Sequence, residues 1–226
     1  MPHTTAARLR EAAFELFAEQ GYDATSVDQV AERAGVGRST FFRTYPSKEA
    51  VIFPDHEAVL SRIEARLAAA TTGQHFLAVR EAAHIVLRHY LDDDEHARAR
   101  YRLTRSVPAL REREIAGMQR YQEAFRRFAR SWYDDADAAA ALRADLRAEL
   151  LAASVVTAHN HVLRRWLRRI TSQGETEAEF ERAMDEVERM FSTREPDDAG
   201  RGGHVVVLGP GADLDEAIDA VRRALS

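Results

Sequence analysis

Two glycines and a proline divide the first fifty residues into short helices, and this spacing constrains the fold more than any other feature. Apolar residues recur at helical spacing over residues 5–20, before Gly21, and recur again before Gly35. Glycine tolerates the left-handed conformation that commonly ends a helix. Pro46 ends a third segment, residues 38–45, because proline cannot continue a helix. A Gly-containing turn between the second and third helices predicts a helix-turn-helix unit.

The caps of these helices differ in strength. Ser26 stands three residues before Gln29, which is the capping-box spacing and marks the start of the second helix. Gly37 precedes the third helix and has no hydroxyl group with which to cap it. We therefore expect a firm start for the second helix and a weaker one for the third.

Helical spacing continues after this unit to about residue 192, with a few clear breaks. A long helix is expected over residues 47–70, and Pro54 should kink or interrupt it. The acidic run at 92–95 favours a new helix N-terminus, and Pro108 should open another helix, since proline is tolerated in the first turn.

The last helices are expected over residues 138–170 and after Gly174. Thr176 and Glu179 have the capping-box spacing, which predicts the start of the final helix of the body. Roughly nine helices result, so the predicted class is all-α, with an N-terminal helix-turn-helix domain and a helical body.

The C-terminal end of the chain has a different composition. Residues 194–203 are polar and rich in glycine, and HVVVLG after them is the one convincing strand signal, followed by a short helical pattern. A single strand must pair with another copy, pack as an arm or stay mobile. The predicted division is therefore 1–50, 51–193 and 194–226.

Charge and composition narrow the class of protein. The net charge is −5, yet Arg33, Arg38, Arg43 and Lys48 follow one another with no acidic residue between them. A small positive patch on an acidic body is predicted. Lys48 is the only lysine of the chain, so its position calls for an explanation.

The chain contains no cysteine, which excludes disulfides, thiolate metal sites and cysteine nucleophiles and suits a reducing compartment. No segment approaches the ~18 uncharged apolar residues of a membrane span. We expect a soluble, cytoplasmic protein that does not contact a membrane.

Residues 8–53 resemble the N-terminal DNA-binding region of the TetR family of ligand-responsive regulators. The stretches AERAGV and TFFRTYPSKE carry the resemblance, with spacing that agrees across three helices. It implies a homodimeric transcriptional regulator, more often a repressor than an activator, whose helical body binds a small molecule. It also implies that Lys48 lies beside DNA phosphate, where a compact ammonium could suit better than a planar guanidinium.

The third helix would enter the major groove of a near-palindromic operator, with its early residues at base edges. Phe42 stands where the family often has tyrosine, so it could contact a thymine methyl instead of phosphate. The residues expected to contact DNA are Ser26, Arg38, Ser39, Thr40, Phe42, Arg43, Thr44, Tyr45 and Lys48.

An aromatic stripe in the body could line a pocket between helices, although such stripes are more often simply core. The residues expected to contact a flat, largely apolar or acyl-like ligand are Tyr90, Tyr101, Tyr121, Phe125, Trp132 and His159. His159 and His161 cannot share a metal ion, because helix positions two apart point about 200° apart. No metal and no other cofactor is expected.

The dimer interface is expected on the last two long helices, about 143–170 and 177–192, which would form a four-helix bundle from two copies. Two alternatives stay open at this point. One is a helical adaptor that binds protein through the same three-helix unit. The other is a helical enzyme, which lacks support because no nucleophile elbow, phosphate loop or zinc-binding motif is present and no catalytic residue can be named.

Overall fold

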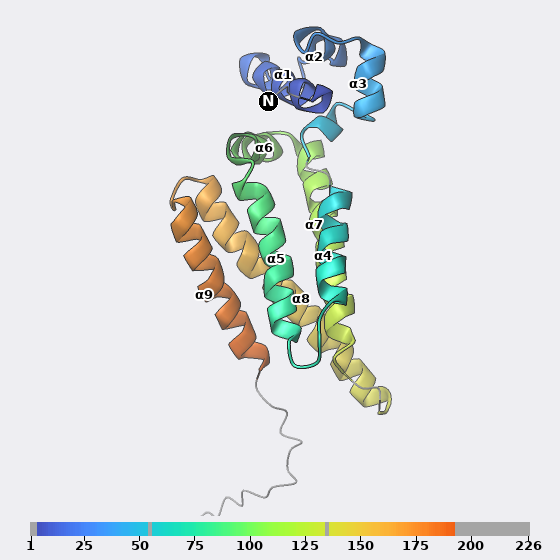
Figure 1. Ribbon diagram of the computed structural model, residues 1–226, viewed down its shortest axis with the longest axis vertical. Helices are drawn as coiled ribbons and strands as arrows, with labels where there is room; N and C mark the ends of the chain where they lie inside the picture. Colours follow the sequence, from blue (N-terminus) through green and yellow to red (C-terminus); the bar gives the residue numbers. More distant parts are fainter. Residues whose placement is uncertain (1–3, 54–55, 134–135, 193–226) are drawn as a thin grey trace, which may run out of the picture. The chain divides into compact units, whose positions relative to one another are not determined.

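The computed structural model describes residues 4–53, 56–133 and 136–192, and every regular element among them is helical. The described residues up to Phe191 belong to one compact unit (Figure 1). The all-α class is therefore confirmed for this part of the chain. The expected C-terminal strand and helix lie outside the described residues. The elements are α1 (Thr5–Gln20), α2 (Val27–Arg33), α3 (Arg38–Thr44), the 3-10 helix η1 (Glu49–Val51), α4 (His56–Ala68), α5 (His75–Leu91), α6 (Asp94–Ser106), α7 (Pro108–Arg130), α8 (Ala138–Leu167) and α9 (Gln173–Phe191).

Local chemistry sets the boundaries of the first helices as expected. Gly21 and Gly35 follow α1 and α2 with φ of 85° and 66°, in the left-handed region that favours glycine. The Ser26 side chain accepts from the Gln29 amide and the Gln29 side chain accepts from the Ser26 amide, so the capping box is present. Gly37 caps α3 without a side-chain bond.

The helix expected over residues 47–70 is interrupted, as Pro54 predicted, and α4 begins at His56. Two details need correction. The part between Pro46 and Pro54 forms only a single 3-10 turn, η1. The last helix begins at Gln173, because Ser172 and Glu175 form the capping contacts. Thr176 is instead buried inside the first turn of α9, where its hydroxyl contacts Thr171.

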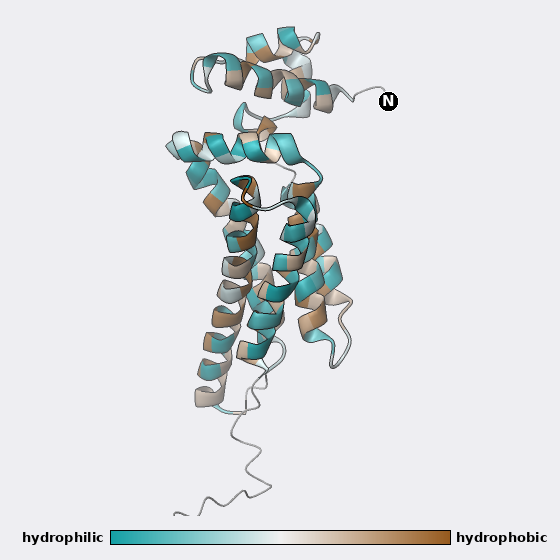
Figure 2. Cartoon of the chain, turned by 90° about the vertical axis from the view of Figure 1, so that its left-hand side faces the viewer, coloured by the Kyte–Doolittle hydropathy of each residue, from teal (hydrophilic) through white to brown (hydrophobic). Residues whose placement is uncertain are grey.

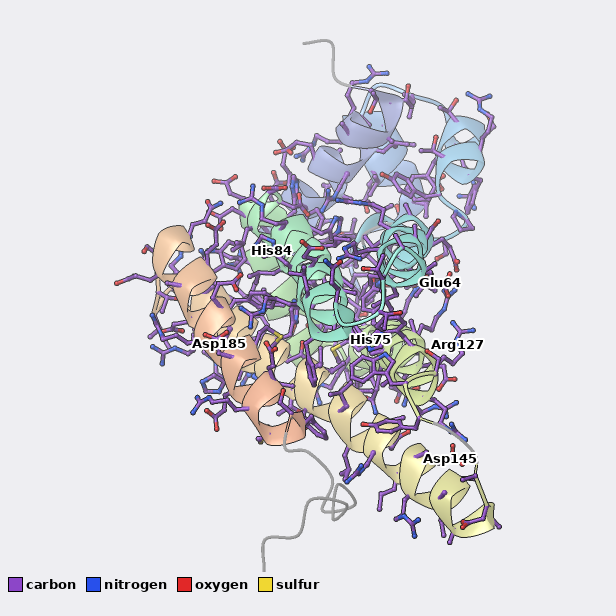
Figure 3. The ribbon with its side chains drawn as sticks, turned by 60° about the horizontal axis from the view of Figure 1, so that its bottom comes forward. Glu64, His75, His84, Arg127, Asp145 and Asp185 are labelled. Carbon is purple, nitrogen blue, oxygen red and sulfur yellow. The ribbon has the colours of Figure 1, made fainter. Side chains whose placement is uncertain are left out.

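The apolar residues form two cores. The larger one lies among α4, α5, α7, α8 and α9 and includes Ile63, Leu87, Leu151 and Phe180. The smaller one lies among α1, α2, α3 and the segment 49–53, which we call the head, and it also contains Leu110 from the first turn of α7. The head therefore completes its core with a residue from the helical body. Exposed ion pairs, such as that of Arg127 with Glu64 between α7 and α4, add polar contacts outside these cores (Figure 3).

Helix α6 lies between the head and the other helices of the body (Figure 1). On the head side, Asp93, just before α6, pairs with Arg10 of α1, and the ring of His96 lies 4.8 Å from that of Phe14. On the body side, Ala97 belongs to the larger core. Arg100, between them, is only 1% exposed.

Gly117 of α7 lies where α4 packs against α7, so a substitution there measures how tight this packing is. A β-carbon at this position would lie 3.0 Å from the ring of His56, and that ring is held by a 2.6 Å contact between its Nδ1 and the Tyr121 hydroxyl. Alanine gains about 1 kcal/mol of helix propensity over glycine, whereas overpacking costs about 1–3 kcal/mol. We expect Gly117→Ala to lower the free energy of unfolding by about 1 kcal/mol in denaturant titrations.

Gly174→Ala in α9 is the matched control, because a β-carbon there meets nothing within 4 Å. This variant should be at least as stable as the parent protein. Equal stability of the two variants would show that the His56 ring yields freely and that the contact is loose.

Candidate DNA interface and ligand cavity

The outer face of α3 carries exposed side chains with hydrogen-bond donors. Arg38, Ser39, Phe42 and Arg43 are all exposed. Arg38 donates to Asp28 at 2.6 Å, and its guanidinium carbon lies 5.2 Å from the centre of the Phe42 ring. An ion pair this exposed is worth little, so Arg38 can exchange its carboxylate for another anion at small cost. Arg43 makes no ion pair with any described residue and is available to an anionic partner.

Other residues expected to contact DNA use their polar groups inside the head. The Thr44 hydroxyl donates to the Thr40 carbonyl at 2.9 Å, and the Tyr45 hydroxyl donates to the Ala6 carbonyl at 3.1 Å. Tyr45 thus ties the end of α3 to α1, while Phe41 beside it is fully buried. The Ser26 hydroxyl caps α2. The structure therefore gives Ser26, Thr44 and Tyr45 positioning contacts within the head.

Lys48 also has internal partners. Its Nζ donates to the carbonyls of Tyr22 at 2.8 Å and Thr25 at 2.9 Å and lies 4.0 Å from the centre of the Tyr22 ring. These carbonyls belong to the loop between α1 and α2. The Tyr22 hydroxyl in turn donates to Glu49 at 2.6 Å. An ammonium group can direct its donors at two carbonyls from one point above a ring, which a planar guanidinium cannot do in the same space. The lone lysine thereby fixes the α1–α2 loop.

Replacing Lys48 by arginine and Arg43 by lysine distinguishes the internal role of Lys48 from the exposed position of Arg43. Lys48→Arg should lower the free energy of unfolding by about 1–2 kcal/mol, because a net hydrogen bond to a charged group contributes about 1.5–3 kcal/mol and the guanidinium keeps only part of the pair. Arg43→Lys should leave stability unchanged within about 0.5 kcal/mol, because Arg43 is exposed. Chemical denaturation of both variants measures the difference. Two equally stable variants would contradict the internal role of Lys48.

The body contains a cavity of about 140 Å³ among α5, α6, α7 and α8. Five of the six residues expected to contact a ligand line it: Tyr90, Tyr101, Tyr121, Phe125 and His159. Trp132 does not line this cavity. It stacks on His75, with ring centres 5.1 Å apart, at the far end of α7, because the aromatic stripe of α7 continues past the cavity (His75 is labelled in Figure 3).

Two histidines near the cavity are held neutral. Burial lowers the pKa of His159 to about 4, and its Nδ1 lies 3.2 Å from the Asn160 side-chain oxygen. Burial, reinforced by the charge of Arg100, lowers the pKa of His56 to about 4. The contact of the His56 ring with Tyr121, which lines the cavity, connects the cavity to the first residue of α4.

The cavity lining includes residues that the aromatic pattern did not reveal. They are Met118 and the polar residues Glu114, Asn160 and Arg164. Glu114 lies four residues before Met118 and seven before Tyr121, so it shares their stripe of α7. That spacing could have identified it, but a stripe defined by aromatic residues does not include a carboxylate.

One chain of contacts leads from the cavity to the head. Tyr90 lines the cavity, and the guanidinium carbon of Arg100 lies 4.7 Å from the centre of its ring. Arg100 Nη1 donates to the Ile52 carbonyl at 3.3 Å and lies 3.9 Å from Asp93. Ile52 is buried in the core of the head, and Asp93 pairs with Arg10 of α1. Because Arg100 contacts both Ile52 and Asp93, a shift of the Tyr90 ring would be transmitted through Arg100 to two segments of the head.

Among the described residues, no helix has the length and apolar character needed to cross a membrane, and hydrophilic and hydrophobic residues alternate along each helix (Figure 2). Within the same residues, no group of three histidine or acidic side chains is placed to hold a metal ion.

Comparison with known proteins gives matches to the head and to the fold. Residues 9–53 match the model of the tetR family of bacterial regulatory proteins. MftR of Mycobacterium tuberculosis is 39% identical over 64 residues, which cover 28% of this chain and 32% of MftR. The chain thus spans about a third of that relative's length.

Two solved structures share the fold of the described unit. FadR of Bacillus subtilis in complex with stearoyl-CoA has a TM-score of 0.54 at 17% identity, covering 80% of this chain and 96% of FadR. The SmeT–triclosan complex has a TM-score of 0.53 at 17% identity, covering 83% of this chain and 91% of SmeT. At these identities the likeness concerns the fold.

Proposed function

We propose that this chain is a member of the tetR family of bacterial regulatory proteins and a DNA-binding transcriptional regulator that responds to a small molecule bound in its helical body. One observation carries the proposal: the family match spans the head, and the head presents the exposed cations Arg38 and Arg43 on one face of α3. The acidic net charge elsewhere confines DNA to this face.

In this proposal α3 enters the major groove. Ser39, Thr40 and Phe42 face base edges, and the two arginines contact phosphate or guanine. The remaining members of the expected set act indirectly. Ser26, Thr44, Tyr45 and Lys48 fix the angle between α3 and the rest of the head through the internal bonds described above.

We propose that the regulator is a homodimer that uses α8 and α9. Leu142, Leu146 and Leu150 recur every four residues along α8 and are 71%, 59% and 50% exposed. Met190 of α9 is 52% exposed and lies with Leu150 on the edge of an apolar groove. Exposed large apolar residues arranged as a stripe are typical of a helix that packs on a partner. A two-fold dimer would place its two α3 helices about 34–36 Å apart, in successive major grooves.

The ligand is proposed to act as an inducer that releases the DNA of a cytoplasmic repressor. It would favour a position of Tyr90 and Arg100 that moves the head away from the spacing required by DNA. FadR and SmeT, which share the fold, have been crystallised with stearoyl-CoA and triclosan. The cavity of about 140 Å³ favours a compact ring over a long acyl chain.

DNA binding is tested by titrating the full chain with DNA that flanks its own gene, at several salt concentrations. Wild-type protein should prefer a near-palindromic site and lose affinity linearly in log salt. Arg43→Ala should weaken binding by about tenfold or more and, if Arg43 contacts phosphate, reduce the salt slope by about one.

Arg127→Ala is the matched control, because Arg127 is an exposed arginine that pairs with Glu64 and lies outside α3, α8 and α9. It should bind DNA as wild type does. No site-preferring binding by the wild-type protein would overturn the proposal and favour a helical adaptor that binds protein through the same head.

Dimerisation is tested by Leu146→Glu. A charge in the centre of the exposed stripe should lower the mass measured by light scattering from twice the 25.4 kDa of one chain to that of one chain. Leu77→Glu on α5 is the control, because Leu77 is 45% exposed and lies outside the stripe. A Leu146→Glu variant that stays dimeric at micromolar concentration would place the interface elsewhere.

A further inference from the structure

The charged residues that line the cavity in the body, Glu114 and Arg164, lie at one of its ends. Along α7, Glu114 lies nearest to the α6 end, and Phe125 lies about three turns farther along the helix. Tyr101 of α6 and Arg164, in the last turn of α8, are also at the Glu114 end. Val155 belongs to the Phe125 end. A ligand that fills this space must have one polar end and one apolar end.

Glu114 carries an acidic group into this space. Its carboxyl group is mostly buried, and burial raises its pKa, although a hydrogen bond with Thr104 and the charge of Arg100 act in the opposite direction. A carboxylate that has lost water is stabilised by any cation that comes within contact distance. The cavity therefore favours a ligand that brings a positive charge to this end.

The basic groups near Glu114 compensate it only in part. The guanidinium of Arg100 donates to the Ile52 carbonyl, lies over the Tyr90 ring and is 3.9 Å from Asp93. Its Nε and Nη2 have no hydrogen-bond partner among the described residues, so Arg100 acts on Glu114 through its charge and not through a hydrogen bond. Arg164 is exposed, and water screens its charge.

The size of the cavity limits the ligand. An engineered cavity of about 150 Å³ in another protein binds benzene, so a space of about 140 Å³ holds one ring with at most a short arm. Larger molecules would have to part the helices. The ring would lie beside Met118 and Tyr121, one and two turns along α7 from Glu114, and the arm would reach Glu114.

We infer that the cavity recognises a compact aromatic or alicyclic molecule with a protonated amine, for which Glu114 supplies the countercharge. The inference rests on the proposed function in one respect, namely that this cavity is the effector site. It replaces the flat or acyl-like ligand expected from the aromatic stripe with a specific chemical class. It also assigns a recognition role to a residue that the stripe alone did not include.

Three probes of nearly equal size and different charge test this inference: benzylamine, benzyl alcohol and benzoate. Their affinities for the full chain are measured at neutral pH, without DNA, by ligand-detected NMR. We expect benzylamine to bind most tightly and benzoate least tightly. Glu114→Gln should weaken benzylamine about tenfold, the loss expected for a charged hydrogen bond, and change benzyl alcohol less than about twofold.

Glu112→Gln is the matched control, because Glu112 is exposed on the same helix and does not line the cavity. It should leave all three affinities unchanged. The order of the three probes on the wild-type protein decides the question even if Glu114→Gln does not fold.

Tighter binding of benzoate than of benzylamine would overturn the inference and make Arg164 the recognising charge. Binding of none of the probes would overturn it as well. Either result leaves the regulator proposal intact if the DNA titration succeeds. Conversely, benzylamine binding that depends on Glu114 in a protein that binds no DNA would support the site while the regulator proposal fails.

Discussion

The buried guanidinium of Arg100 is the interaction on which the relation between head and body depends. An arginine that is 1% exposed is costly unless its donors and charge are matched, and here the partners come from different segments. It donates to the Ile52 carbonyl, lies near Asp93 and covers the Tyr90 ring. Its Nε and Nη2 have no hydrogen-bond partner among the described residues, so the loss of any of these contacts would leave the buried charge still less compensated. The partners are therefore held in one arrangement.

The head depends on this arrangement for its own core. Three short helices bury little apolar surface, and small domains are marginally stable alone. Leu110 from α7 is fully buried in the head's core, and Leu103 and Val107 pack against that core from α6 and the turn after it. The orientation of α3 is thus tied to the positions of α6 and α7. Because both helices also line the cavity, a ligand there has a direct mechanical route to the DNA-reading face.

Features set by neighbouring residues could be predicted from the sequence. The ends of α1 and α2 follow from the conformational freedom of Gly21 and Gly35, and the start of α2 follows from the capping box of Ser26. The predicted start of α9 was wrong because Ser172 and Thr176 both have an acidic residue three positions later. Local pattern could not choose between them. Burial of Thr176 against Thr171 decides it, and that burial is a tertiary effect.

The candidate site was less predictable because its contacts join distant segments. Tyr121 and Phe125 of the α7 stripe line the cavity and Trp132 does not, because periodicity cannot say where along a helix a cavity ends. The bonds of Lys48 to the loop between α1 and α2 span more than twenty residues of sequence. No local rule would have found them.

The central claim is that Arg100 holds the head in a fixed position on the body. Because the chain has no cysteine, a single spin label at Glu32→Cys, an exposed position on α2, reports the distance between the two heads of a dimer. Double electron–electron resonance of the labelled dimer should give one narrow distribution of the distance between the two labels. Arg100→Met should broaden or shift it at unchanged dimer mass, while Arg102→Met, an exposed neighbour on α6, should not. The same narrow distribution in Arg100→Met would contradict the account.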